Sequence, residues 1–316
     1  MTDELKRSLD TVIADCLAVA PGEDVLVVVD AETRELGDAL RRRAAAAGAD
    51  AVLALMDERE ANGTEPPPPV AAALAAADVF VAPTSKSLSH TRARKAASDA
   101  GARGATMPGV TTEMLARVMA VNFAALRARS AAVARALSEA EEAHLTCPRG
   151  SDLRIDLRKR DGISDDGDLS APGAFGNLPC GEGFIAPAGG EGTVVASSLA
   201  VIGLAAEPAR LTVRDGRLAE ATGPEGERLL EALRAHGDAG VNLAELGVGT
   251  NDRATLTGNV LEDEKILGTV HVAFGASAGI GGTVAVPIHL DVVVLDATLT
   301  AGGKPILDAG RLVVEA

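Results

Sequence analysis

Short apolar runs alternate with helix-like stretches through the first part of the chain, and this alternation restricts the fold more than any other feature. The apolar runs lie at residues 24–30, 51–56, 78–83 and 104–107. Stretches rich in Ala and Arg, such as residues 32–47, separate them. Strands that alternate with helices of this length form right-handed crossovers and a parallel sheet. We therefore expect an N-terminal, doubly wound α/β domain with a parallel sheet at residues 1–140.

The pattern changes after His144. Short apolar runs separated by Gly, Asp and Pro fill residues 141–316, and only residues 224–236 have the spacing of a helix. Several short strands with turn residues between them are typical of a mainly antiparallel sheet. We expect residues 141–316 to form an α+β, mainly antiparallel C-terminal domain.

Two apolar runs of this second domain carry polar side chains in strand register. His271 lies between Val270 and Val272, and His289 and Asp291 alternate with apolar residues. Residues i and i+2 of a strand share a face, so His289 and Asp291 point the same way. A buried carboxylate is costly unless a cation or a donor compensates it. The pattern predicts a metal site in the second domain.

Two isolated carboxylates, Glu182 and Glu245, extend this set, because both lie in glycine-rich surroundings within the same domain. Imidazole and carboxylate together suit divalent Zn, Co or Mn. Five protein ligands are more than one catalytic zinc usually takes, so two ions that share a bridging carboxylate fit better. Taken alone, each residue has a simpler explanation: a Glu in such a loop often forms a turn, and a lone His often packs in a core.

Composition limits the possible partners. Hydrophobic residues make up 47 % of the chain and aromatic residues 2 %, with no Trp or Tyr, so the core must be aliphatic. A net charge of −15 argues against nucleic acid and anionic membranes as partners. The N-terminus lacks the apolar stretch of a signal peptide, and the three cysteines are scattered. We expect a cytoplasmic protein that binds neither nucleic acid nor membrane.

Four weaker patterns have ordinary structural explanations. The run 275–282 is glycine-rich like a phosphate-binding loop, but no helical pattern follows it, so we expect a loop that shapes a site. Cys180 is expected to be a small buried residue, and residues 87–90 the start of a helix. The charged run 262–265 is typical of a solvated turn.

Four separated motifs follow one another along the second domain: Asn-Leu-Pro-x-Gly-Glu at 177–182, Glu-Leu-Gly-x-Gly-Thr-Asn at 245–251, Asp-Glu-Lys-Ile-x-Gly-Thr-x-His at 263–271 and His-x-Asp at 289–291. Together they resemble the thermophilic aminopeptidase family, the aminopeptidase T and S metallopeptidases. The resemblance implies a homodimeric hydrolase that removes N-terminal residues from peptides or small aminoacyl amides through a metal-activated water. It makes Glu182, Glu245, His271, His289 and Asp291 metal ligands, with Glu182 or Glu245 as the bridging or catalytic carboxylate.

Two departures keep other functions open. The family has a Tyr soon after the histidine that matches His271, whereas this chain has no Tyr, and the chain is shorter than the peptidases. A distant branch of the same fold contains dihydroxypyridine ring-cleaving dioxygenases, in which two His and one carboxylate hold one Fe(II). His271, His289 and Asp291 could form that triad. In that branch, however, a histidine matches Glu245 and the Glu182 motif is not kept, so both glutamates favour the hydrolase. A third possibility is an inactive relic whose metal only holds the fold.

Overall fold

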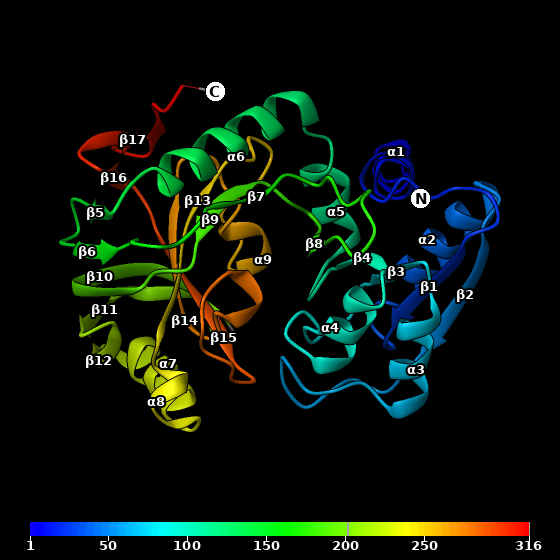
Figure 1. Cartoon of the computed structure of the whole chain (residues 1–316), viewed down its shortest axis with the longest axis horizontal. Helices are drawn as coiled ribbons and strands as arrows, with labels where there is room; N and C mark the ends of the chain where they lie inside the picture. The colour runs from blue at the N-terminus through cyan, green and yellow to red at the C-terminus, as the bar shows by residue number, and fades with distance from the viewer. Residues whose placement is uncertain (201, 316) are drawn as a thin grey trace. The chain divides into compact units, whose positions relative to one another are not determined.

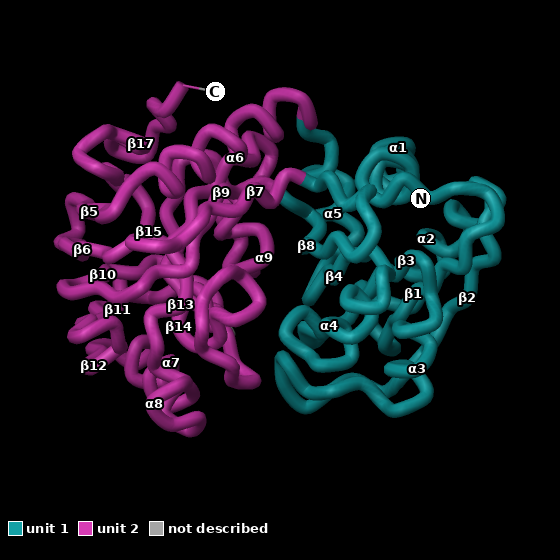
Figure 2. The backbone as a smooth tube through the Cα atoms, in the orientation of Figure 1, with its two compact units in different colours: residues 1–121, 167–180 teal, residues 122–166, 181–316 magenta. Residues whose placement is uncertain are grey.

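The computed structural model describes residues 1–200 and 202–315, and this part of the chain forms two compact units. Unit 1 comprises Met1–Val121 and Gly167–Cys180, and unit 2 comprises Asn122–Asp166 and Gly181–Ala316 (Figure 2). The chain therefore passes from unit 1 to unit 2, back to unit 1, and again to unit 2. This division differs from the single boundary that we expected at residue 140.

Unit 1 contains a parallel sheet with the strand order β2-β1-β3-β4-β8 (Figure 1). Its strands are β1 (Asp24–Val29), β2 (Asp50–Leu55), β3 (Val79–Ala82), β4 (Arg103–Thr106) and β8 (Phe175–Asn177). Its helices are α1 (Asp3–Asp10), the π-helix η1 (Thr11–Cys16), α2 (Arg34–Ala46), α3 (Pro68–Ala76), α4 (Arg92–Asp99) and α5 (Thr112–Val118).

The central strands of this sheet are apolar without alternation because both of their faces are covered. Every residue of β1 after Asp24 is buried, as are all four residues of β3. Continuous apolar runs of this kind are typical of parallel strands that have helices on both sides. The core of unit 1 includes Leu26, Val28 and Phe80, together with Leu74 from α3.

Strand β8 was not predicted from the sequence. Its residues pair with β4 in parallel, Gly104 with Phe175 and Thr106 with Asn177. The sequence Phe-Gly-Asn is too short to show a strand periodicity. It is a strand because it pairs with β4 of the first sheet, and this pairing places residues 167–180 in unit 1.

Unit 2 contains an antiparallel sheet with the strand order β18-β17-β16-β5-β6-β10-β15-β14-β13-β9-β7, to which β11 and β12 add beside β10. Its strands are β5 (Glu142–Thr146), β6 (Asp152–Asp156), β7 (Ile163–Asp165), β9 (Glu182–Ile185), β10 (Gly189–Leu199), β11 (Gly203–Arg214), β12 (Arg217–Thr222), β13 (Leu243–Gly249), β14 (Val270–Gly275), β15 (His289–Val294), β16 (Thr298–Ala301), β17 (Lys304–Asp308) and β18 (Arg311–Leu312). Its helices are α6 (Phe123–Ser138), α7 (Pro224–Arg234), α8 (Gly237–Gly240), α9 (Val260–Asp263) and the 3₁₀ helix η2 (Ala278–Ile280).

Helix α6 explains why the first boundary lies before residue 140. The side chain of Asn122 accepts a hydrogen bond from the Ala125 amide and caps the helix, so α6 begins as a separate element after α5. It then contacts β7 and β9 of the antiparallel sheet, and its Val133 and Leu137 join the aliphatic core of unit 2. Its buried face therefore belongs to the second unit, although its sequence continues the helical pattern of the first.

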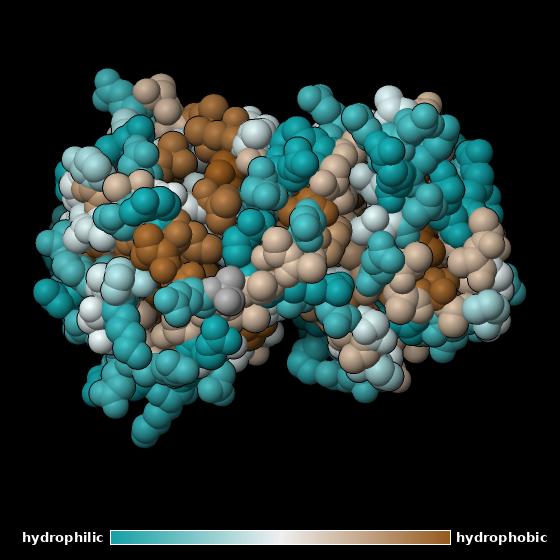
Figure 3. All heavy atoms as spheres, turned by 90° about the horizontal axis from the view of Figure 1, so that it is seen from above, coloured by the Kyte–Doolittle hydropathy of each residue, from teal (hydrophilic) through white to brown (hydrophobic). Residues whose placement is uncertain are grey.

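The expected fold class is confirmed: a doubly wound parallel-sheet unit and a mainly antiparallel unit. Hydrophilic residues cover most of the face seen in Figure 3, and hydrophobic residues form smaller patches on it. Within the described residues, no helix combines the length and the apolar character needed to cross a bilayer.

Arg103 of β4 joins several groups inside unit 1, and its replacement tests how much that junction contributes. Its guanidinium donates to both carboxylate oxygens of Glu23 at 2.8 and 2.7 Å and to the carbonyl oxygens of Leu17 and Ala18. We expect Arg103→Met to lower the free energy of unfolding by about 2–4 kcal/mol, because it removes the buried guanidinium that donates these four hydrogen bonds. Urea denaturation followed by circular dichroism measures the loss.

The matched control is Arg92→Met, because the Arg92 side chain is 92 % exposed and pairs with Glu65 at the surface. We expect it to cost less than about 1 kcal/mol. The Arg103 bond holds the pKa of Glu23 below its ordinary value. The stabilisation is therefore present above that ordinary value and lost as the pH falls through the lowered pKa, so the Arg103→Met deficit should shrink in acid. A deficit that is constant with pH would show that the ion pair does not contribute.

Candidate metal centre

Four neighbouring strands of unit 2 carry all the side chains that the sequence predicts as ligands. These are Glu182 at the start of β9, Glu245 in β13, His271 in β14, and His289 and Asp291 in β15. The strands pair in the order β9-β13-β14-β15. The structure therefore brings these predicted residues together.

The strand register places these side chains on one face, with small residues between them. Ala273 of β14 lies opposite Glu245 on one side and opposite Asp291 on the other. Directly opposite residues of paired strands share a face, so both carboxylates project over Ala273. On the same face Gly247 lies opposite His271, and a methyl group at Gly247 would overlap the His271 ring. Small side chains in these strands leave the room that the polar ones occupy.

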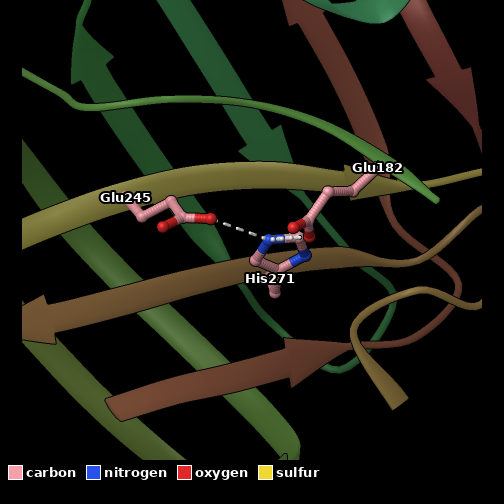
Figure 4. Close-up of side chains that lie close together, drawn as sticks. All are labelled: Glu182, Glu245 and His271. Carbon is pink, nitrogen blue, oxygen red and sulfur yellow. Dashed lines mark hydrogen bonds and ion pairs between the residues drawn. The ribbon is translucent and has the colours of Figure 1, made fainter. Parts of the chain in front are cut away.

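The ring of His271 lies between two carboxylates (Figure 4). Its Nε2 is 3.0 Å from Oε2 of Glu182 and 3.2 Å from Oε1 of Glu245. The ring of His289 has a similar environment, with Nε2 at 3.3 Å from the other oxygen of Glu245 and 3.5 Å from Oδ1 of Asp291. Glu245 thus contacts both imidazoles, through a different oxygen each time.

Among the described residues, two groups have the arrangement of a metal-binding cluster, with potential ligand atoms within 4.8 Å of one another. One is Glu182, Glu245 and His271, and the other is Glu245, His289 and Asp291. The two groups share Glu245. A ligand set of His271, His289 and Asp291 would therefore take one residue from the first group and two from the second. Glu245 lies between the two imidazoles of that set.

One hydrogen bond fixes the orientation of His289. Its Nδ1 is 2.7 Å from the carbonyl oxygen of Ala276, which can only accept, so Nδ1 carries a proton. Ala276 follows β14, in the glycine-rich loop that we expected to shape a site. A backbone carbonyl that holds one ring nitrogen and directs the other toward a metal is a common feature of metal-binding histidines.

The charges in the centre shift the pKa values of its members in opposite directions. Burial alone would lower the pKa of His271, but the Glu182 and Glu245 carboxylates outweigh it and raise that pKa well above its ordinary value. For His289, Asp291 and Glu245 outweigh burial in the same way. Burial would raise the pKa of Glu245, yet its hydrogen bonds with the two imidazoles lower it to about 2. Without a metal, the buried carboxylates therefore need protons on both rings.

These residues fit a divalent metal ion. Each Nε2 faces two carboxylate oxygens, and a ring nitrogen carries at most one proton, so one oxygen of each pair is left without a donor from that ring. Oε2 of Glu182 is buried and makes no hydrogen bond within the described part of the chain. A cation among these atoms would satisfy the oxygens and accept the nitrogen lone pairs. Imidazole with carboxylate is a donor set that Zn, Fe, Co and Mn all use.

A buried lysine beside this centre was missed in the sequence. The charged run 262–265 was expected to be a solvated turn, and this expectation is wrong: Glu262, Asp263 and Lys265 are buried. Nζ of Lys265 lies 2.5 Å from Oε1 of Glu182 and 2.7 Å from Oε1 of Glu264. Apolar neighbours at Leu261 and 266–267 were the available signal, because they indicate a buried segment.

Lys265 also changes the acidity of its neighbours. Burial raises the pKa of Asp165 and of Glu264 to about 8 even though Lys265 opposes this. Burial would raise the pKa of Glu182 too, but Lys265 and His271 lower it to about 2. Glu182 is therefore the carboxylate that carries the negative charge opposite the Lys265 ammonium. Cys180, two residues before Glu182, is buried as expected.

Comparison with known proteins identifies the family. The family model of 2,5-dihydroxypyridine 5,6-dioxygenase (NicX) matches residues 5–314. The chain belongs to this family. No curated protein matches the chain. The structure of 2,5-dihydroxypyridine dioxygenase from Pseudomonas putida KT2440 is similar with a TM-score of 0.84 and 20 % identity, over 99 % of this chain and 98 % of that one.

A peptidase structure has a similar fold. Wild-type AmpT from Thermus thermophilus matches with a TM-score of 0.71 and 20 % identity, over 98 % of this chain and 99 % of that one. The resemblance to the aminopeptidases therefore holds for the fold. At this identity it extends no further than the fold.

The expected function, a metal-dependent aminopeptidase-like hydrolase, is wrong. The family match over nearly the whole chain overturns it, together with the expectation of a metallopeptidase. The chain is an enzyme, as expected, but one of a dioxygenase family. The motifs misled us because both kinds of enzyme share the scaffold on which those motifs lie. The ligand and catalytic roles of Glu182 and Glu245 stay predictions.

Gly247 provides a test of the centre that leaves every polar group in place. We expect Gly247→Ala to displace the His271 ring, lower the affinity for a divalent ion by about 10- to 100-fold and destabilise the fold by about 1–3 kcal/mol. Titration with Co(II) and thermal denaturation measure both effects. Gly189→Ala is the control, because a methyl group there meets nothing within 4 Å. Equal affinities in the two variants would contradict the assignment of His271.

Replacement of Asp291 tests whether the carboxylate on β15 is a metal ligand. Metal that binds only the native state raises the melting temperature by mass action. We expect Asp291→Asn to lose this metal-dependent rise, because the amide lacks the charge that the centre offers to a cation. Asp296→Asn makes the same change at an exposed turn residue with positive φ, which Asn tolerates, and should retain the rise. Full metal content in Asp291→Asn would remove Asp291 from the ligand set.

Proposed function

We propose that this protein is an iron-dependent dioxygenase that opens the ring of a hydroxylated N-heteroaromatic substrate of the dihydroxypyridine type. The observation that carries the proposal is the family match over residues 5–314, combined with two imidazoles and a carboxylate on the adjacent strands β14 and β15. A two-His, one-carboxylate set with open positions is the usual ligand arrangement of non-haem Fe(II) oxygenases.

His271, His289 and Asp291 are the residues that would hold the iron. Bound Fe(II) would supply the redox chemistry that allows O₂ to react with an electron-rich ring. The protein groups around the iron would orient its ligands and set the local charge. The Ala276 carbonyl fixes the His289 ring, and the two oxygens of Glu245 lie 3.2 and 3.3 Å from the Nε2 atoms of His271 and His289, where they would be next to the iron. Burial of these side chains limits access of bulk water to the reacting groups.

Glu245 has an electrostatic role in this proposal. In the metal-free protein its contacts with the two imidazoles lower its pKa to about 2, and a bound cation would likewise favour its ionised form. An ionised carboxylate accepts hydrogen bonds or contacts a cation but carries no proton to donate. Its proposed task is therefore to add negative charge next to the iron.

Oxygen uptake tests the proposed reaction. We expect anaerobically purified protein loaded with Fe(II) to consume one O₂ for each dihydroxypyridine whose ring absorbance is lost, because a dioxygenase places both oxygen atoms in its product. We expect His289→Ala to lower kcat/KM by more than the 10- to 100-fold that is typical of losing an outer partner of a metal ligand. An oxygen electrode and ultraviolet spectra measure both quantities.

His236→Ala is the matched control, because His236 is an exposed histidine outside the candidate centre. It should retain wild-type activity. The panel should include the dihydroxypyridine isomers, catechols and aminoacyl amides. Iron-loaded protein that consumes no O₂ with any aromatic substrate would contradict the proposal, as would aminoacyl hydrolysis without O₂.

A further inference from the structure

Unit 2 contains a groove whose lining residues are all separate from the metal centre. Its volume of about 560 Å³ is within the range of small-molecule sites. It lies between the turn that joins β11 to β12 and the end of α7 with the short helix α8, and α7 packs against both of these strands (Figure 1). The charged residues that line the groove are Arg214, Asp215, Arg217, Arg234 and Asp238.

Two of these arginines lie opposite each other across the hairpin. Arg214 of β11 pairs with Arg217 of β12, and the turn residues between them, Asp215 and Gly216, both have positive φ. Directly opposite residues share a face, and like charges in this position destabilise the pair. Glu220 compensates Arg214 at 2.8 Å. The side chain of Arg217 makes no hydrogen bond or ion pair with any residue that the structure describes.

Arg234 of α7 brings a third guanidinium to the groove. Its Nη2 donates to the Ala219 carbonyl at 2.8 Å, which leaves the rest of its N–H groups without an acceptor in the described chain. Arg234 has an ordinary place in the last turn of its helix, where a cation is favoured. Asp215 in the turn and Asp238 in the first turn of α8 are equally ordinary. Local structure offers no such reason for the charge of Arg217.

The free donors of Arg217 and Arg234 suit an oxyanion. Guanidinium groups bind carboxylates and phosphates through paired N–H donors, and an anion beside Arg217 would also reduce its repulsion by Arg214. The whole chain has 45 acidic and 30 basic residues, yet arginines outnumber aspartates in the lining of this groove. The groove is therefore an exception to the acidic character of the protein.

We propose that this groove binds a small molecule through a carboxylate or phosphate group, which Arg217 and Arg234 hold. The site is distinct from the metal centre, and the proposal does not depend on the dioxygenase reaction. The two residues bind the ligand in this proposal and take no part in ring cleavage.

Two backbone amides beside the groove should report its occupancy. The Leu218 amide donates to the Val241 carbonyl at 2.8 Å, and the Leu243 amide donates to the Gly216 carbonyl at 2.9 Å. These bonds join the hairpin that carries Arg217 to the start of β13. A ligand that holds the hairpin in place should therefore slow hydrogen exchange at both amides.

Calorimetric titration of the full-length protein tests binding, with malonate as the carboxylate probe and inorganic phosphate as the phosphate probe. Low ionic strength is needed because salt screens exposed charges. We expect at least one probe to bind, and the tighter one identifies the ligand class. Arg217→Gln and Arg234→Gln should each weaken binding by about 10- to 100-fold, the effect of losing a charge-assisted hydrogen bond. Arg228→Gln changes an exposed arginine of α7 outside the groove and should retain wild-type affinity.

Hydrogen exchange then locates the bound anion. We expect the tighter probe to protect the Leu218 and Leu243 amides in the wild type and to lose this effect in Arg217→Gln. All the replaced arginines are exposed, so the variants should fold, and circular dichroism checks this. Failure of both probes to bind would overturn the proposal. Equal affinities in the wild type and Arg217→Gln, or binding without protection, would also overturn it and indicate an adventitious ion only or an anion held elsewhere, for example on a bound metal ion.

Discussion

Compensation of buried negative charge is the constraint on which the centre of unit 2 depends. Glu182 and Glu245 are each 6 % exposed, and neither could remain ionised there without positive charge close by. Two imidazoles and the Lys265 ammonium supply that charge in the protein itself, and a bound cation would replace the imidazole protons. Lys265 differs from the imidazoles in one respect: its ammonium has no lone pair and therefore cannot be a metal ligand.

The sheet makes this concentration of charge possible because it supplies space at the same positions. Strand β14 contributes Ala273 between two carboxylates, and β13 contributes Gly247 beneath the His271 ring. The opposite faces of these strands carry Val, Leu and Phe side chains that belong to one aliphatic core. Each strand therefore stabilises the fold with one face and holds the centre with the other.

Much of this could be predicted from residue patterns. The alternation of polar and apolar residues around His289 and Asp291 reports a strand face, and the structure brings both residues together with His271 and Glu245. Lys265 was missed because the charged run was judged by its own residues, which look the same in water and in a buried ion-pair network; only the apolar residues on either side of the run indicate burial. The reaction could not be deduced from the fold either, because a dioxygenase and a peptidase structure both share it.

The domain boundary was predicted incompletely for a different reason. Periodicity identifies a helix but not the sheet that it covers, so α6 was placed with the helices that precede it. Strand β8 is defined by its partner β4 and has no pattern of its own. Both elements are assigned by contacts between residues far apart in the chain, which local sequence does not report.

The double passage of the chain between the units affects how such a protein can evolve. Because residues 167–180 complete the parallel sheet, a chain cut after Val121 would leave β4 as an edge strand with unpaired backbone groups. The same segment leads directly into Glu182 of the other unit. No single recombination point in the gene could therefore exchange one unit and leave the other whole. Diversification of this scaffold should proceed by substitution within the site and not by shuffling of domains.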